Sequence, residues 1–395
     1  MFQRLRVILL MLVTVFIGFG LIIPVVPLMV TNVGAQAIQL GLLLAVYSAV
    51  SFFMSPYWGR LSDRIGRRPI LIIGLFGYAL SFLVFGFASH LLWLMYLSRI
   101  IGGGFSGAVT STAMAYIADV TDVENRTKGM AFAGMSIGFG FIIGPAVGGL
   151  LGGVNISLPF FVAAALAILN ALWGLFALDE SLSPQVRQAR HDHSREQKLS
   201  RWAAFQGSLK YMYLVDFVSQ FTISALEGCL QLFEMWKIHA TAEQIGWMFF
   251  ISGVVGALIQ GGIVRRYVTH GREVPTLYIG LFVSAVGLVL LIFSKNFATA
   301  AIYMTVFGAG NTVLKPTLTS LVTKETKVGQ GLANGLLSSM DSLARMVGPV
   351  LATLVYEVHV NLPFLLAAAV AILAMGLVAS YQVSKRHETI VKIAS

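Results

Sequence analysis

Twelve apolar runs dominate the sequence, and they restrict the chain to a membrane protein. Each run has about the 20 residues that a helix needs to cross a bilayer. The chain is 57% hydrophobic and 11% charged, with a mean hydropathy of +0.82, whereas a soluble domain carries about 25% charged residues. The sequence therefore predicts an all-α polytopic membrane protein. The runs cover residues 7–30, 40–58, 70–88, 93–118, 129–151, 157–178, 209–234, 244–264, 275–294, 298–322, 331–355 and 362–383.

The basic residues lie almost entirely on one side of this predicted arrangement. The N-terminus, the loops after the even-numbered runs and the C-terminal tail hold 22 of the 27 Lys and Arg residues, counting Lys210 at the edge of a run. Lys and Arg prefer cytoplasmic loops, so we expect both termini in the cytoplasm. Anionic headgroups attract such residues, so the net charge of +10 indicates contact with membrane lipids and requires no nucleic acid.

A polar stretch divides the chain into two halves of six runs each. Residues 179–207 form the longest polar segment, and we expect a cytoplasmic linker there. The predicted units are a six-helix bundle over 1–178 and a second six-helix bundle, with a short tail, over 208–395. The His-Asp-His sequence at 191–193 is interpreted as part of a solvated loop and not as a metal site.

Corresponding runs of the two halves share sequence features. Run five contains Gly144-Pro145 and run eleven contains Gly348-Pro349, each past the middle of its helix. The loop at 262–272 occupies the position in the second half that the loop at 59–69 occupies in the first. Internal repeats with a substrate site between them at the midplane are a recurring plan of transporters.

The loop at 59–69 reads Gly-Arg-Leu-Ser-Asp-Arg-Ile-Gly-Arg-Arg-Pro, and we expect a tight polar turn there because glycine permits backbone conformations closed to other residues. Asp63 is a candidate cap for a neighbouring helix N-terminus, where a carboxylate is favoured. The alternative is a basic loop that only sets orientation. The glycines and charged residues singled out in this loop are Gly59, Asp63, Arg64, Gly66, Arg67 and Arg68.

Two further stretches combine polar or helix-breaking residues with closely spaced glycines. Arg99 lies early in run four, where an arginine inside a span is a functional candidate by default, although a side chain two turns from the membrane surface can also extend to it. In run five, small residues at a spacing of four allow close helix contact, and proline bends the helix. The run-five motif comprises Gly140, Gly144, Pro145, Gly148 and Gly149.

These motifs resemble those of the major facilitator superfamily. The loop at 59–69 resembles its loop between helices 2 and 3, the Arg99 segment its helix-4 motif, and the run-five segment the helix-5 motif of drug:proton antiporters. The overall likeness is to the twelve-helix antiporters of the Bmr/NorA multidrug efflux type. The resemblance implies a major facilitator fold with two pseudo-symmetric six-helix bundles, a loop that helps to hold the cytoplasmic side closed, and a role for Arg99 in proton transfer.

Glu227 in run seven is the leading candidate for proton coupling. It lies about 14 Å from the outer end of its helix, near the midplane, and removing a carboxylate from water disfavours its charged form. Such a group can be neutral and protonated, or ionised and paired with a cation. The resemblance assigns this role to the acid at this position. Asp341 in run eleven is also near the midplane, and it is either a coupling residue or the structural partner of Arg345 four residues on.

The chain departs from the resembled pumps in run ten. Those pumps have a second acid where this chain has Asn311, which cannot titrate, and the basic position that follows is Lys315. Asp341 or Asp216 are candidates to replace the missing acid, although Asp216 is nearer the cytoplasmic end. Glu234 is expected at the outer interface.

Four aromatic residues match positions that face the drug cavity in the resembled pumps. Aromatic faces suit flat, lipophilic cations. From spacing alone, each would equally be an ordinary core or lipid-facing residue. They are Phe16, Tyr47, Phe141 and Phe307.

The predicted function is proton-coupled efflux of lipophilic, often cationic, small molecules across the cell membrane by alternating access. The single cysteine excludes an internal disulfide and a cysteine metal cluster, and no P-loop is present. We expect no enzyme activity, no cofactor, no metal and a monomeric transporter. The alternatives are a proton-coupled exporter of one metabolite, sugar or lipid-like molecule, and an uncoupled sensor or scramblase.

Overall fold

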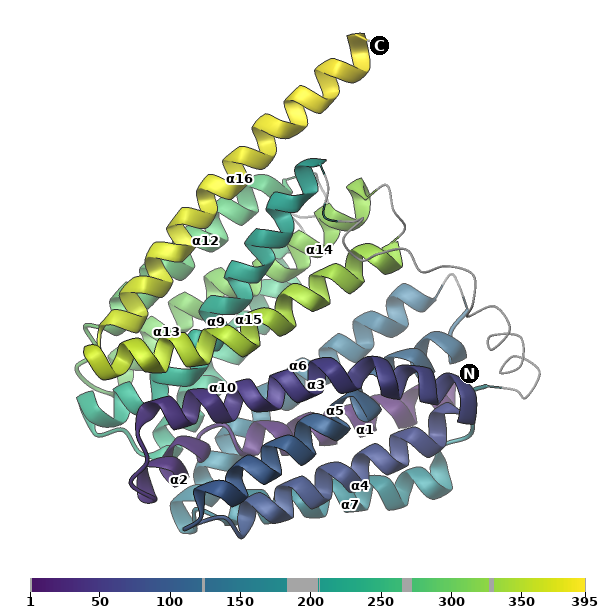
Figure 1. The fold of residues 1–395 in the computed structure, drawn as a ribbon, viewed down its shortest axis with the longest axis vertical. Helices are drawn as coiled ribbons and strands as arrows, with labels where there is room; N and C mark the ends of the chain where they lie inside the picture. Colours follow the sequence, from purple (N-terminus) through teal and green to yellow (C-terminus); the bar gives the residue numbers. More distant parts are fainter. Residues whose placement is uncertain are drawn as a thin grey trace. The chain divides into compact units, whose positions relative to one another are not determined.

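Every regular element in the computed structural model is a helix over the residues it describes, which are 2–122, 125–182, 205, 207–264, 272–326 and 330–394. Each of the twelve predicted runs is helical (Figure 1). In the first half, the helices are α1 (Phe2–Leu21), α2 (Val26–Asn32), α3 (Ala37–Ile65), α4 (Arg67–Gly86), α5 (Leu92–Val120), α6 (Arg126–Val154) and α7 (Leu158–Ala177). In the second half, they are η2 (Gly207–Leu209), α9 (Lys210–Ile238), α10 (Ala242–Ile259), η3 (Gln260–Val264), α12 (Glu273–Leu291), α13 (Phe297–Thr312), α14 (Leu314–Glu325), α15 (Gln330–Val358) and α16 (Leu362–Ala394).

Two runs that the sequence analysis treats as single spans are broken helices. The first divides into α1 and α2 around residues 22–25, and the tenth divides into α13 and α14 at Val313. Pro24 lies within the first break, and Pro316 follows the second by three residues. Proline has no N–H to donate and its ring clashes with the preceding turn, which accounts for an interruption at each place.

The turn after the second run is shorter than the sequence analysis predicts. The prediction began the turn at Gly59, but α3 continues through Gly59 to Ile65. Only Gly66 leaves the helix, with φ 113° and ψ 161°, a backbone conformation that side-chain-bearing residues rarely adopt. One glycine therefore makes the whole turn between α3 and α4, and the prediction that Gly59 also serves this purpose is wrong.

Ten helices, counting broken ones as single spans, are long and apolar enough to cross a membrane among the residues that the structure describes. The helices α9 and α15 have the length, at 29 residues each, but they carry several charged residues within it. Helices α9 and α15 hold Glu227 and Asp341, so the two spans with the weakest apolar character are those with the predicted coupling residues.

The N-terminal unit consists of Met1–Lys198 together with Thr241–Phe250. Its main helix contacts are α1 with α6, α3 with α5, α4 with α5, and α4 with α7. The small residues of α6 face two neighbours. Gly144 lies against Gly20 of α1, and Gly149 lies against the start of α10 at Ala242.

The C-terminal unit consists of Leu199–Ala240 together with Ile251–Ser395. Its main contacts are α9 with α15, α12 with α13, α12 with α16, and α9 with α16. The contact of α9 with α15 matches that of α1 with α6, since runs seven and eleven correspond to runs one and five. Gly228 of α9 lies against Pro349 of α15, as Gly20 lies against Gly144 in the first half. The pairing agrees with two repeats of one helical plan.

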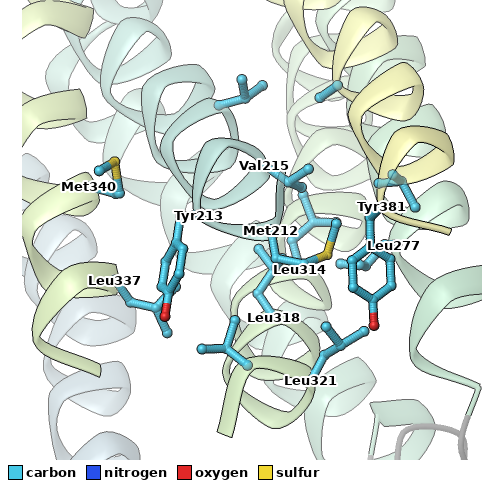
Figure 2. Close-up of a cluster of buried hydrophobic side chains, with 14 of the residues drawn as sticks. Met212, Tyr213, Val215, Leu277, Leu314, Leu318, Leu321, Leu337, Met340 and Tyr381 are labelled. Atoms are coloured by element: carbon cyan, nitrogen blue, oxygen red, sulfur yellow. The ribbon is translucent and has the colours of Figure 1, made fainter. Parts of the chain in front are cut away.

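A cluster of buried apolar side chains lies near the N-terminal ends of α9 and α15. Figure 2 shows Leu314 and Leu318 of α14 among residues of the neighbouring helices, with Tyr213 and Leu337 to one side and Tyr381 to the other. Leu318 and Tyr213 are fully buried. Packing of α14 on this cluster fixes the start of that helix, where Lys315 lies.

Candidate functional site

Three charged side chains from three helices of the C-terminal unit form one ion-pair cluster, here called the lysine triad: Asp216 of α9, Lys315 of α14 and Asp341 of α15. Lys315 Nζ lies 3.0 Å from each oxygen of Asp216, and 2.8 and 2.7 Å from Oδ1 and Oδ2 of Asp341. Asp216 is 1% exposed, Asp341 26% and the Lys315 side chain 43%. Intramembrane charges are rare and pair with one another at functional sites, so this cluster is the leading candidate site.

The predicted partner of Asp341 is different from the observed one. Sequence spacing favours a pair with Arg345 on the same helix, but Asp341 binds Lys315 and Arg345 faces Gln220 of α9. With its amide oxygen turned toward the guanidinium, Gln220 accepts from Nε and Nη2 of Arg345 at 3.1 Å each. The Arg345 charge also acts on Glu227. Asp216, Gln220 and Glu227 follow one face of α9, and this face meets the charged residues of α15.

Glu227 is partly buried. It lies eleven residues along α9 from Asp216, about 16 Å at 1.5 Å per residue. The structure thus separates two acidic positions along one helix, Glu227 near Arg345 and Asp216 in the lysine triad. Asn311 is 6% exposed and its amide nitrogen lies 3.4 Å from the Ser219 carbonyl oxygen and 3.3 Å from Thr222 Oγ1. It therefore contacts α9 between these two acidic positions.

Removing the charge of Lys315 is expected to destabilise the protein. Lys315→Met leaves Asp216 without its cation at a position that is 1% exposed. Breaking a buried pair costs about 3–5 kcal/mol, and since Lys315 itself is 43% exposed, we expect about 1–3 kcal/mol in thermal unfolding. The triple variant Asp216→Asn, Lys315→Met, Asp341→Asn should recover most of this loss because no charge is left unpaired. Lys295→Met, at an exposed lysine, is the control; equal effects at both lysines would contradict the prediction.

In the N-terminal unit, Arg67 organises the loop that the sequence analysis identifies as gating. It is 4% exposed. Its Nε donates to Asp119 at 3.0 Å, its Nη1 to Ser62 at 2.5 Å and its Nη2 to Asp63 at 2.7 Å. Arg64 is exposed. The side chain of Arg67 therefore ties the end of α3 to the end of α5.

The carboxylate at the N-terminus of α4 belongs to Glu180. It accepts from the backbone N–H of Arg67 at 2.9 Å and of Arg68 at 3.2 Å, and Arg68 also donates to the Leu175 carbonyl. An acid at this end of a helix is favoured by the unpaired N–H groups and the helix dipole. Asp63, the residue predicted for such a cap, pairs with Arg67. Most of the predicted linker at 179–207 and most of the repeat loop at 262–272 lie outside the described residues.

Arg67→Lys is expected to weaken this network although it keeps the charge. A lysine has one nitrogen and cannot reach three acceptors in different directions, so buried acceptors lose their partners at about 1–3 kcal/mol. Thermal unfolding in detergent measures the loss. Arg64→Lys, at the exposed neighbouring arginine, should change the unfolding temperature little, and a larger effect at Arg64 than at Arg67 would contradict this account.

Arg99 is buried, which decides against extension of its side chain to the membrane surface. It is 6% exposed, and its guanidinium carbon lies 4.7 Å from the centre of the Phe85 ring. Its Nε has no hydrogen-bond partner among the described residues. A buried arginine held over an aromatic ring fits the functional reading of this position better than the surface reading.

The predicted aromatic residues of the first half lie together. Ring centres of Phe16 and Phe141 are 5.4 Å apart, and Phe19 lies 5.7 Å from both Phe141 and Tyr47. All four side chains are partly exposed, so they form one aromatic surface from α1, α3 and α6. Phe307 lies in the other unit, where it is 5% exposed and its backbone contacts Gly287.

The predicted helix-5 motif is a packing surface. A methyl group at Gly148 would lie 2.0 Å from the Leu21 carbonyl oxygen, and one at Gly140 would lie 2.6 Å from Cβ of Phe16. Gly149 and Pro145 face α10, because a methyl group at Gly246 would lie 2.3 Å from the Pro145 carbonyl oxygen. The motif brings the backbones of α1 and α10 onto α6.

Sequence reasoning missed four participants: Phe19, Asp119, Glu180 and Gln220. Phe19 follows Phe16 by three residues in the first run, and helical spacing predicts that they share a face. Asp119 and Glu180 lie just beyond the ends of runs four and six, where an acid is ordinarily a solvated loop residue. Gln220 carried no signal in one sequence, because polar residues on a charged helix have many possible partners.

Comparison with known proteins shows the family of the chain. The Major Facilitator Superfamily model matches residues 8–267 and 211–394. The chain is 31% identical to Multidrug resistance protein 2 of Bacillus subtilis (strain 168), over 92% of this chain and 91% of that protein. It is 27% identical to Quinolone resistance protein NorA of Staphylococcus aureus, over 96% and 95%.

The fold is similar to those of solved transporter structures. The nucleoside transporter NupG superposes with a TM-score of 0.79 at 14% identity, covering 96% of this chain and 99% of that one. A bacterial homologue of the human lysosomal transporter Spinster gives 0.79 at 14% identity, covering 97% and 96%. With its paired helical repeats, its charged α9 and α15 and its loop motif, the chain belongs to the major facilitator superfamily and is a multi-pass membrane transporter, not an enzyme.

Proposed function

We propose that this protein is a proton-coupled antiporter that exports lipophilic, cationic compounds across the cell membrane by alternating access. The observation that carries the proposal is the set of ionisable side chains along α9, α14 and α15. The similar proteins are named for multidrug and quinolone resistance, which supports drug-like substrates. Positive charge at the loops after even-numbered spans favours cytoplasmic termini.

The charge of this set suits exchange of one cation for one proton. The lysine triad has two carboxylates and one ammonium, and Glu227 and Arg345 add one charge of each sign. The five groups sum to −1 when all are ionised. Uncompensated charge away from water is costly, so the site favours one further positive charge, supplied by a proton or by a monovalent cationic substrate. Competition between the two is the basis of antiport.

Glu227 is the group that we assign to this exchange. Asp216 and Asp341 each hold Lys315 within 3.0 Å, whereas Glu227 is acted on by a single guanidinium that also faces Gln220. Glu227 would therefore release a bound drug when it takes a proton from outside, and would bind the next drug after it loses the proton inside. The lysine triad keeps a fixed counter-charge on the same face of α9.

Within the N-terminal unit, the aromatic surface of Phe16, Phe19, Tyr47 and Phe141 would contact lipophilic substrates. Rings that are partly exposed and tilted against one another offer both faces and edges to a flat cation. The network of Arg67 with Asp63 and Asp119 would act as the latch on the cytoplasmic side, because it joins the ends of α3 and α5.

Ethidium efflux from proteoliposomes tests the proposal. With the wild type, an imposed pH gradient that is acid on the side receiving the dye should accelerate ethidium movement toward that side. Abolishing the gradient with an ionophore should remove the acceleration. Ethidium movement at the same rate with and without the gradient would contradict proton coupling, and no ethidium movement would favour a narrower substrate range.

A further inference from the structure

Glu234 is an acidic residue that the proposed mechanism does not use. It follows Glu227 by seven residues on α9, and Gln231 lies between them at four residues from Glu227. Positions i, i+4 and i+7 share one face of an α-helix. The three side chains therefore form a polar stripe from the middle of α9 toward its C-terminal end, about 10 Å long at 1.5 Å per residue.

The stripe is buried at its C-terminal end, where the sequence analysis expects Glu234 at the outer membrane interface. Glu234 is 0% exposed and Gln231 is 2% exposed, so Glu234 is buried in the protein although it lies about one turn from the end of α9. One carboxyl oxygen, Oε1, lies 3.0 Å from Ser294 Oγ. The other, Oε2, has no hydrogen-bond partner among the described residues. An ionised carboxylate in such surroundings is costly because only one of its two oxygens has a donor among the described residues.

The contacts of Ser294 leave one oxygen of Glu234 without a donor. A hydroxyl has one hydrogen to donate, and Ser294 Oγ is 2.8 Å from the Leu291 carbonyl oxygen as well as 3.0 Å from Glu234 Oε1. The Leu291 carbonyl oxygen already accepts from the Ser294 backbone N–H at 3.1 Å, so the Ser294 hydroxyl can donate to Glu234 Oε1. The second oxygen, Oε2, is then the place on this buried carboxyl group that lacks a partner among the described residues and can hold a proton.

The cations near Glu234 are engaged elsewhere. Lys237, one turn further along α9, donates to the Ile292 carbonyl and lies 5.3 Å from the centre of the Phe233 ring. Lys295, which follows Ser294, is exposed, as is His239 at the end of α9. Lys237 acts on Glu234 through its charge, but no cation lies within 4 Å of the carboxyl group among the described side chains.

We infer that Glu234 is a proton-holding residue that supplies Glu227 from the outer side of the membrane, with Gln231 positioning the path between them. This inference rests on the proposed antiport. When a drug leaves Glu227, the proton leaves a carboxyl oxygen of Glu234 and binds a carboxylate oxygen of Glu227, along the face of α9 that both share with Gln231. Glu234, now ionised, takes a proton from the outer solution, and the charge balance is restored.

Two measurements on Glu234→Gln test the inference in the full-length protein. The glutamine keeps the shape and the hydrogen bond to Ser294 but has no exchangeable acid. In infrared spectra, the wild type should show a carbonyl band of a protonated carboxylic acid that this variant lacks. In proteoliposomes, gradient-driven ethidium efflux should fall about tenfold, while ethidium binding to the purified protein stays unchanged.

Control variants separate proton transfer from a purely structural contact. Ser294→Ala removes the partner but leaves the acid, so efflux and the infrared band should both survive, and Glu234→Asp should restore part of the efflux. Glu243→Gln, at an exposed glutamate, should behave as the wild type. Efflux by Glu234→Gln with the rate and pH dependence of the wild type would overturn the inference.

The infrared band distinguishes failure of this inference from failure of the proposed antiport. If the wild type shows no gradient-driven efflux, the proposed antiport is contradicted. An infrared band that Glu234→Gln removes would then show that Glu234 is protonated but does not pass a proton to Glu227. If the wild type is coupled but no band depends on Glu234, the relay alone is overturned.

Discussion

Glu227→Gln is expected to abolish gradient-driven ethidium efflux, leaving only the rate of protein-free liposomes. Glutamine occupies the same space but neither takes up a proton nor carries a negative charge. The five-group set then sums to zero before any substrate arrives, so neither a proton nor a cationic drug has an uncompensated charge to neutralise. We therefore expect ethidium binding to weaken as well, which fluorescence titration of the purified protein measures.

The control for this variant is Glu243→Gln. Glu243 is an exposed glutamate in the first turn of α10, and its neutralisation should leave efflux unchanged. Efflux that survives Glu227→Gln at the wild-type rate would move proton coupling to the lysine triad. Asp341→Asn, which removes the more exposed of the two triad acids, would then be the variant in which coupling is lost.

Gly148→Ala is expected to have the largest effect on stability. A methyl group there would lie 2.0 Å from the oxygen and 2.6 Å from the carbon of the Leu21 carbonyl. Both are backbone atoms, so no side-chain rotation relieves the overlap, and α1 and α6 must move apart. Overpacking typically costs about 1–3 kcal/mol, and a clash with backbone atoms belongs at the upper end of this range, so thermal unfolding in detergent should show a large drop in melting temperature.

Another glycine of the same helix provides a matched comparison. A methyl group at Gly138 would meet no atom within 4 Å. Because alanine favours the helix over glycine by about 1 kcal/mol, Gly138→Ala should leave the melting temperature unchanged or raise it slightly. If the two variants unfold at the same temperature, the close contact of α1 with α6 does not stabilise the protein as described.

Much of the fold follows from sequence because apolar length and charge asymmetry depend on the bilayer and not on tertiary contacts. All twelve spans are helical where predicted. The differences occur where a single residue decides the backbone. Gly66 makes the turn alone, while Gly59 stays helical, and the breaks near Pro24 and at Val313 fall inside runs that are continuous in hydropathy.

The site was predictable by residue but not by partner. Glu227, Lys315, Asp341 and Arg345 stand out because charges are rare in spans. Their pairing depends on how α9, α14 and α15 pack, which one sequence does not specify. Asp341 therefore pairs with Lys315 of another helix. Helical spacing alone favours a pair of Asp341 with Arg345, four residues further along α15. The burial of Glu234 has the same cause, because it depends on the contact of α9 with the segment around Ser294.

Proton movement driven by the substrate is the most direct test of the central claim that one cation exchanges for one proton. Proteoliposomes containing the wild type and a trapped pH-sensitive dye would be exposed to external ethidium with no imposed pH gradient. Antiport predicts that ethidium entry drives protons out, so the internal pH rises in the wild type and not with Glu227→Gln. Ethidium entry through the wild type without any change of internal pH, or with acidification, would contradict the account.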